Sequence, residues 1–181
     1  MIPTVEWKDG IVRMLDQTKL PFETVYVDCK DYQTVAQGIK ELWVRGAPAI
    51  GVAAAYGVTL GILNSKPGQS LDRRLDEVIA RLARTRPTAR NLFWALERMR
   101  HAYEENRHLP AAEIGLRLVR EAQEVEREDY EMNRMIGAHG RDLIRDGDSV
   151  LTHCNAGELA TAGYGTALGV IRAAFEQGKK F

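Results

Sequence analysis

The chain has 181 residues, with 25 basic and 25 acidic side chains, a formal net charge of zero and 45% hydrophobic residues. This composition is typical of a soluble globular protein, and the length suits one domain or two small ones. Zero net charge argues against a broad nucleic-acid-binding or polybasic membrane surface, although it leaves room for a local anion site.

The cysteine content and the N-terminus indicate a reduced, cytoplasmic protein. Cys29 and Cys154 are the only cysteines, which is unlike a disulfide framework. Glu6, Lys8 and Asp9 stand where a signal sequence would need an apolar core.

The first 28 residues are typical of a small antiparallel β-meander. The runs 5–8 and 11–15 are separated by Asp9-Gly10, a strong hairpin signal. Leu20-Pro21 then breaks the chain, and residues 22–27 are expected to form a third strand. We expect this meander to be a structural support or lid at the edge of a site.

Two helices are predicted next, over residues 31–45 and 47–63. The second is rich in Gly and Ala, has no charge, and has Pro48 in its first turn, where proline is favoured. A membrane span is rejected because the segment is short and its residues are small. Arg45 immediately before a helix N-terminus with free N–H groups is a good phosphate site, although an arginine that merely caps the surface is the simpler alternative.

Amphipathic helices are then expected from Leu71 to Leu82 and, after an interruption at 85–90, on to about Glu105. Arg86 precedes a proline at the start of the second, which makes it another candidate anion ligand. Helical character continues over 110–145. The charged stretch 121–129 is interpreted mostly as a solvated face containing a bend or linker, which predicts domains of residues 1–125 and 126–181. His139 is interpreted as a core-edge residue in an apolar stripe.

Residues 149–178 are typical of the opening of a parallel α/β unit. A strand is predicted at 149–153, a tight loop at 154–157 and a helix at 158–177, which Gly178 closes. Cys154 falls at the carboxyl end of the strand, where ligands of such units bind. It is either a buried small hydrophobe or a functional thiol whose pKa His153 and the helix N-terminus lower. Asn155 is expected to hold a left-handed turn or to bind a ligand.

Three motifs carry a resemblance to a known family: VRGAPAIGVAAAYG at 44–57, TRPTARNLFWAL at 85–96, and THCNAG at 152–157 followed by LATAGYGTALGVIRAA. They resemble the family of methylthioribose-1-phosphate isomerases, ribose-1,5-bisphosphate isomerases and the regulatory subunits of initiation factor 2B. Glu158 and Arg90 depart from the family pattern, in which smaller or apolar residues are usual.

The resemblance implies an aldose–ketose isomerase that converts 5-methylthioribose 1-phosphate to 5-methylthioribulose 1-phosphate in methionine salvage. The alternatives are a ribose-1,5-bisphosphate isomerase and a non-catalytic sugar-phosphate or nucleotide sensor. It implies substrate binding by Arg45, Gly46, Ala47 and Arg86, with Cys154 as the catalytic residue. Asn155 and Gly157 would support the site. Neither a metal nor an organic cofactor is implied.

The fold that this resemblance implies is an α/β protein. An N-terminal β-meander and helical domain is followed by the first strand–helix unit of a Rossmann-like domain, and residues 179–181 begin the next strand. The chain is expected to be an N-terminal portion, inactive alone and without the catalytic aspartate. The expected partners are a sugar phosphate, a second copy as in the family, and a complementary C-terminal polypeptide, with no nucleic acid or membrane.

Overall fold

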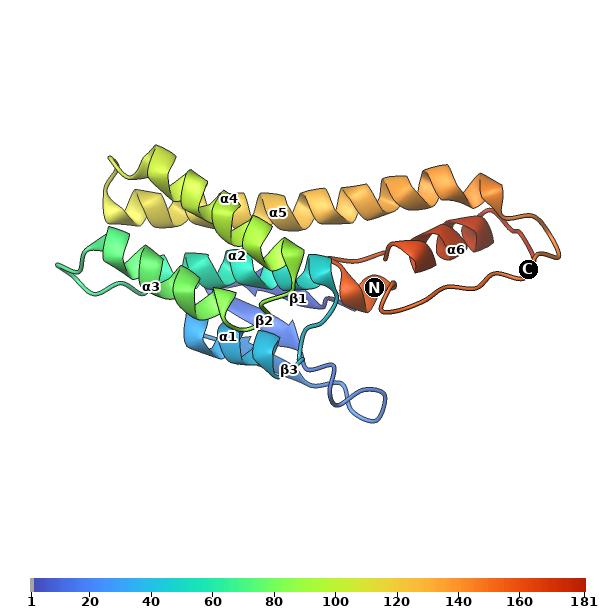
Figure 1. Ribbon diagram of the computed structural model, residues 1–181, viewed down its shortest axis with the longest axis horizontal. Coiled ribbons are helices and arrows are strands. Elements are labelled where there is room, and N and C mark those ends of the chain that lie inside the picture. Colours follow the sequence, from blue (N-terminus) through green and yellow to red (C-terminus); the bar gives the residue numbers. More distant parts are fainter. Residues whose placement is uncertain (1) are drawn as a thin grey trace.

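The computed structural model describes residues 2–181. It begins with a three-stranded antiparallel sheet of β1 (Val5–Lys8), β2 (Ile11–Leu15) and β3 (Tyr26–Cys29), in that order (Figure 1). Asp9 and Gly10, at φ 50° and 84°, make the predicted hairpin turn. The third strand begins later than expected, because residues 16–25 form an excursion closed by a bond from the Asp16 N–H to the Val25 carbonyl.

Helix α1 (Tyr32–Lys40) is shorter than predicted. It ends where Leu42 takes φ 66° and the Trp43 N–H donates to the Gly38 carbonyl. The chain then enters α2 (Ala47–Leu63), whose bounds agree with the prediction. Helices α3 (Leu71–Ala83) and α4 (Arg90–Asn106) also occur where the apolar repeats indicated.

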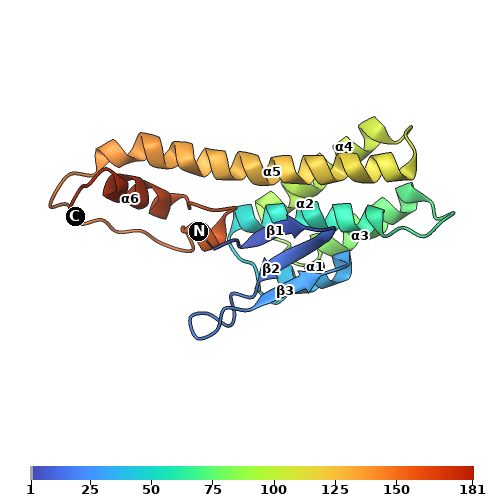
Figure 2. The same cartoon turned by 180° about the vertical axis from the view of Figure 1, so that it is seen from behind.

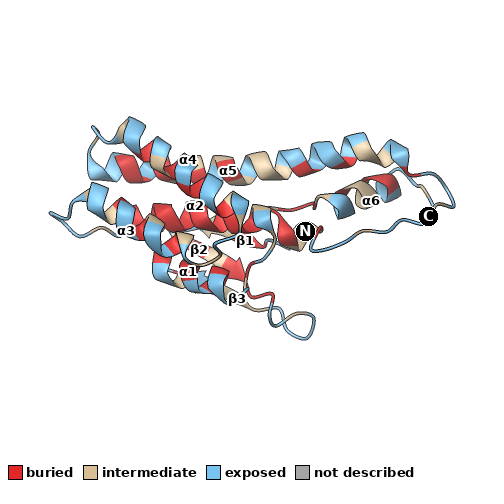
Figure 3. Ribbon diagram, in the orientation of Figure 1, coloured by how far each residue is buried: buried red, intermediate tan, exposed pale blue. Residues whose placement is uncertain are grey.

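Helix α2 is the centre of the fold, and it packs against α1, α3, α4, α5 and the sheet. It is buried on every side from Ala49 to Ile62. Its glycines permit close approach: a Cβ built on Gly61 would lie 2.4 Å from Cγ2 of Val78 on α3, and one on Gly51 would lie 3.1 Å from the Asn91 carbonyl oxygen. The main hydrophobic core therefore surrounds α2, as Figure 3 shows, and the sheet lies in front of α2 in the view of Figure 2.

Helix α5 (Ala111–Gly140) is a single helix of 30 residues, about 45 Å long. The expected bend near residue 125 is absent from it, so the proposed division at 125/126 falls inside a continuous helix and stays a prediction. The charged stretch is only partly a solvated face. Arg127 is exposed, but Glu126 and Asp129 are partly buried against neighbouring segments. Some of these charged side chains therefore pack against the rest of the fold, and the helix continues through the stretch.

After η1 (Arg141–Leu143), the expected strand at 149–153 is not formed in the described chain. Leu151 is 96% exposed, and no neighbouring strand pairs with this segment. Residues 179–181 likewise form no strand. The stripe expected to pack there is exposed as well, with His139 on the surface and Leu143 81% exposed. A parallel strand needs partners that these residues do not have.

The helix predicted at 158–177 is interrupted. A single 3₁₀ turn, η2 (Glu158–Ala160), is followed by a loop, and α6 begins only at Ala167 and ends at Glu176. Positive φ values at Gly163, Tyr164 and Gly165 explain the break. Gly178, at φ 85°, closes α6 as predicted. α6 packs beside the second half of α5.

None of the helices in the described chain is long and apolar enough to cross a membrane.

Candidate functional site

The start of α2 is in direct contact with the segment that follows Cys154. Gly46 is the residue before α2 and has φ 91°. A Cβ built on it would lie 2.4 Å from both Cβ and the carbonyl oxygen of Ala160. Only glycine fits this conformation and this contact. Two of the three sequence motifs therefore meet at Gly46 and Ala160, although they are far apart in the sequence.

Hydrogen bonds hold the Ala160 segment in place from two sides. The Thr4 hydroxyl donates to the Glu158 carbonyl at 3.2 Å, and the Gln17 side-chain amide donates to the Leu159 carbonyl at 2.8 Å. From α5, Oδ2 of Asp129 accepts from the Ala162 N–H at 2.7 Å. The segment is thus fixed between the N-terminal strands and α5.

Arg45 and Ala47 flank Gly46 and are both exposed. No side chain caps the helix N-terminus here. Its first N–H groups are therefore available to an anion, and the helix dipole favours negative charge at this end.

Arg86 lies in the link between α3 and α4 and is half-buried. Its Nη1 is buried and has no hydrogen-bond partner within residues 2–181. A buried guanidinium nitrogen without a partner is costly, so an acceptor from a ligand would stabilise it. The start of α4 also has no side-chain cap. This end of α4 lies beside the start of α2 and η2 in both ribbon views.

Cys154 lies in an exposed loop and has φ 69°. Positive φ is uncommon for a residue other than glycine and is found disproportionately at functional sites. The predicted left-handed residue was Asn155, so the turn occurs one residue earlier than expected. Cys154 lines a cavity of about 380 Å³ together with Asn155, Gly157 and Ala160.

The two cysteines differ sharply. Cys29 is fully buried, and burial raises its pKa to about 12, so it remains a thiol with a packing role. Cys154 is exposed in this chain, as the functional-thiol interpretation requires, and its role stays a prediction. Only Cys154 is accessible to a ligand.

Asp129 was missed by the sequence reasoning because it lies in the charged stretch of α5. Its carboxylate accepts from Ala162 N–H and from the Asn133 side chain, and burial raises its pKa. It also lines a cavity of about 350 Å³ with Pro48 of α2 and Trp94 of α4. Helical spacing is the signal that identifies it, because it lies four residues from Val125 and from Asn133, both of them buried.

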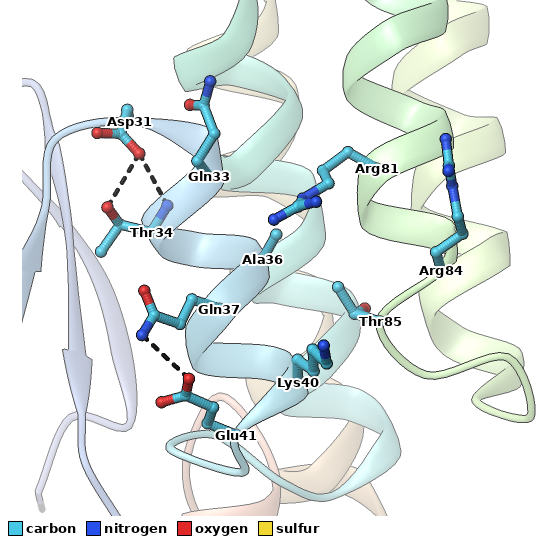
Figure 4. Close-up of a pocket in the computed structure, with 10 residues that line it drawn as sticks. All are labelled: Asp31, Gln33, Thr34, Ala36, Gln37, Lys40, Glu41, Arg81, Arg84 and Thr85. Atoms are coloured by element: carbon cyan, nitrogen blue, oxygen red, sulfur yellow. Dashed lines mark hydrogen bonds between the residues drawn. The ribbon is translucent and has the colours of Figure 1, made fainter.

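A larger cavity of about 600 Å³ lies elsewhere, between α1 and α3 (Figure 4). Its basic residues do not converge: Arg81 points toward α1, while Nε of Arg84 donates to its own helix at Ala80. Asp31 is occupied as the N-cap of α1. This groove does not make a defined ligand site.

Comparisons with known proteins agree with the motifs. The model of the Initiation factor 2 subunit family matches residues 43–181. Methylthioribose-1-phosphate isomerase from Geobacter sulfurreducens is 54% identical over 179 residues, which cover 98% of this chain and 52% of that protein. The Thermotoga maritima enzyme of the same name is 54% identical over 177 residues, covering 98% and 51%. The chain spans about half the length of the curated relatives that it matches.

Two solved structures are similar over 99% of this chain. One is 5-methylthioribose 1-phosphate isomerase from Pyrococcus horikoshii, with a TM-score of 0.90 and 40% identity, of which the chain covers 51%. The other is the delta subunit of translation initiation factor eIF-2B from A. fulgidus, with a TM-score of 0.86 and 42% identity, of which it covers 52%. By its sequence and its mixed α/β fold, this chain belongs to the Initiation factor 2 subunit family.

Proposed function

We propose that this chain forms part of an isomerase that converts 5-methylthioribose 1-phosphate to 5-methylthioribulose 1-phosphate, in methionine salvage. The contact of Gly46 with Ala160 carries the proposal, because it joins an anion-binding helix start to the segment that begins at an accessible cysteine. The identity of 54% to relatives of that name supports the substrate.

In this proposal the phosphate is bound by Arg45, by Arg86 and by the N–H groups at Gly46 and Ala47. Charge-assisted bonds from two guanidinium groups suit a phosphate monoester. The unpartnered Nη1 of Arg86 supports that role. Binding the phosphate would fix the sugar relative to the thiol of Cys154.

The reaction breaks the bond between C1 and the ring oxygen and moves one hydrogen from C2 to C1. The C2 hydroxyl becomes a carbonyl, and the proton that it loses is balanced by the one that the released ring oxygen gains as it becomes a hydroxyl. Carbon 2 is oxidised and carbon 1 is reduced, so no external oxidant is required. The anomeric oxygen carries the phosphate, which prevents a free aldehyde from forming readily. Cys154 would donate a hydrogen bond or a proton to the oxygen where charge develops. Asn155 and Gly157 would shape the loop around it.

We also propose that a further polypeptide segment completes a Rossmann-like sheet on residues 149–153 and supplies the remaining acid–base group. The exposed apolar side chains of Leu143 and Leu151 support this, since side chains of this type are usually covered. The relatives are about twice as long as the chain, which supports it as well. Two free cysteines fit a cytoplasmic location, and dimerisation through the added segment belongs to the same proposal.

A non-catalytic regulatory subunit is the second candidate, favoured by the similarity to the A. fulgidus delta subunit at a TM-score of 0.86. A ribose-1,5-bisphosphate isomerase would share the phosphate site and differ elsewhere in the pocket. The accessible thiol of Cys154 favours an enzyme over a sensor.

Binding and turnover test the proposal separately. Titration of the chain with methylthioribose 1-phosphate and with ribose 1,5-bisphosphate should show tighter binding of the first, which Arg86→Ala weakens and the exposed control Arg73→Ala does not. Isomerisation should then be measured with the remaining half of the Geobacter sulfurreducens relative added in trans. Loss of turnover in Cys154→Ser, but not in Cys29→Ser, is expected. Substrate binding with turnover that is indifferent to Cys154→Ser would favour the sensor.

A further inference from the structure

Gln17 is a buried polar residue two positions after the end of β2, and its side chain is one of the donors that hold the Ala160 segment. Only 5% of it is exposed. Buried amides need hydrogen-bond partners, and Gln17 has two that lie in different parts of the chain. Its backbone N–H donates to the Trp43 carbonyl at 3.0 Å, and its side-chain Nε2 donates to the Leu159 carbonyl at 2.8 Å.

These two partners belong to the two halves of the candidate site. Trp43 lies two residues before Arg45, in the connection that leads into α2. Leu159 lies inside η2, next to the Ala160 that contacts Gly46. One residue thus bonds both to the segment that carries the proposed phosphate ligands and to the segment that follows Cys154.

Gln17 is itself held in a fixed turn. The neighbouring Asp16 is 6% exposed, and its Oδ1 accepts from the Thr18 N–H at 3.0 Å and from the Thr18 hydroxyl at 2.6 Å. The Asp16 N–H donates to the Val25 carbonyl. An amide on such a turn can impose its position on its partners, because little of its own freedom remains.

We propose that Gln17 is a positioning residue, which sets the placement of the Cys154 loop relative to the anion-binding start of α2. The role rests on the proposed function. Thr4 and Asp129 hold the segment 158–162 on either side of Leu159. Without the side-chain amide of Gln17, this segment would remain attached at those two points. It would lose the hydrogen bond at Leu159, and with it the link through Gln17 to Trp43. The proposed phosphate ligands would be undisturbed, and the cysteine would be displaced.

Gln17→Met is the main test, because it keeps the length of the side chain and removes both amide N–H groups. Gln17→Asn is the milder variant, since it keeps an amide that is one methylene too short. The control is Gln37→Met. It removes an exposed hydrogen bond of 3.0 Å from the Gln37 side-chain amide to the Glu41 carboxylate, four residues along the chain.

The first readout is amide hydrogen exchange in the 181-residue chain. The N–H groups of Ala160 and Thr161, which bond within η2, should exchange about fivefold faster in Gln17→Met, the size of effect expected from one hydrogen bond, with a smaller effect in Gln17→Asn. Amides of α3 should be unchanged in both variants. Unchanged exchange at 160–161 in folded Gln17→Met would overturn the positioning role, whatever the substrate proves to be.

The second readout separates positioning from general stability. Affinity for inorganic phosphate should stay within twofold of the original. In the protein complemented in trans, kcat should fall several-fold while KM changes little. An equal loss of phosphate affinity and kcat would point to general loosening and contradict the proposal. If the complemented protein does not isomerise methylthioribose 1-phosphate at all, the proposed function fails while the exchange result still decides the role of Gln17.

Discussion

The part of the chain up to Val125 and the part after it are held together in different ways. Up to Val125, large apolar side chains form one core around α2. After it, α6 contacts α5 mainly through small residues: a Cβ built on Gly137 would lie 2.9 Å from the Gly169 carbonyl oxygen and 3.3 Å from Cβ of Ala173. The first part is stabilised by buried area, and the second by close approach and a few specific bonds, such as that from Lys179 Nζ to the Ile144 carbonyl at 2.8 Å.

The largest difference between the two parts is expected for leucine truncation. Leu118 is fully buried, whereas Leu151 is 96% exposed. Leu118→Ala should lower the free energy of unfolding by about 2–5 kcal/mol, and Leu151→Ala by less than about 0.5 kcal/mol. Denaturant unfolding measures both. Similar losses at the two positions would mean that residue 151 is covered in solution.

A substitution at the junction of the two parts should have the next largest effect. Gly46→Ala places a side chain at φ 91° and against Ala160, and should cost about 1–3 kcal/mol from the backbone alone. Gly68→Ala is the matched control, because its φ of 79° carries a similar strain with nothing within 4 Å of the new Cβ. Amide hydrogen exchange at residues 158–162 should be faster in Gly46→Ala than in Gly68→Ala. If they behave alike, the contact with Ala160 contributes nothing.

The pH dependence of stability tests the contacts of α5 with α2. Burial raises the pKa of Glu126, whose carboxylate accepts from the Tyr56 hydroxyl. When folding raises the pKa of a carboxyl group, its contribution to the free energy of unfolding is fully present below the pKa of the unfolded state. That contribution is lost as pH rises through the folded-state pKa. Glu126→Gln keeps an acceptor without the charge. Its stability relative to the original protein should therefore increase from pH 4 to pH 7.

Glu124→Gln on the same helix is the control, because the pKa of Glu124 is shifted in the opposite direction and its effect on stability should have the opposite pH dependence. Hydrogen bonding to Arg127 lowers the pKa of Glu124, so its contribution is present above the ordinary pKa and is lost as pH falls. Thermal unfolding at several pH values distinguishes the two variants. A Glu126→Gln curve that runs parallel to the original would show that this carboxyl is solvated.

The smallest effect on stability is expected for exposed apolar residues, where the readout is association. Leu143 is 81% exposed and Leu151 96%. Leu143→Ser together with Leu151→Ser should reduce concentration-dependent association in analytical ultracentrifugation and leave the unfolding midpoint unchanged. Phe22→Ser, at a 92% exposed position near the sheet, is the control and should change neither. If only Phe22→Ser reduced association, the associating surface would lie near the sheet and not at Leu143 and Leu151.

Sequence reasoning succeeded where the determining interactions are local. The turn Asp9-Gly10 and the proline in the first turn of α2 each specify their own conformation, so the hairpin and α2 were predicted correctly. The strand predicted at 149–153 is not formed, because a strand needs partner strands, which a local pattern does not reveal. The helix predicted from residue 158 is interrupted at Gly163, where the packing of the loop overrides the local helical pattern.

The candidate site was predictable in its motifs and not in its supports. Arg45, Arg86 and Cys154 were candidates from their places before helices and after a predicted strand, the resemblance gave them roles, and those roles stay proposals. Gln17 and Asp129 were missed because each acts on a segment distant in sequence, at 2.8 Å to Leu159 and 2.7 Å to Ala162 respectively. The helical spacing around Asp129 indicates that it faces the core but does not identify Ala162 as its partner, and the residues around Gln17 give no signal of Leu159.

The burial of α2 on every side has a consequence for the direction in which its first turn faces. An amphipathic helix is oriented about its own axis by its polar face, but α2 has none, and water exclusion alone is satisfied at any angle. Two hydrogen bonds, from Tyr56 to Glu126 and from Thr59 to the Leu118 carbonyl, and the shape of its surface decide instead. Val78 and Asn91 fit only where Gly61 and Gly51 leave room, so the direction in which the Gly46 N–H faces is set in part by glycines, one of them about 22 Å along the helix. A search for functional residues near the site would not find it.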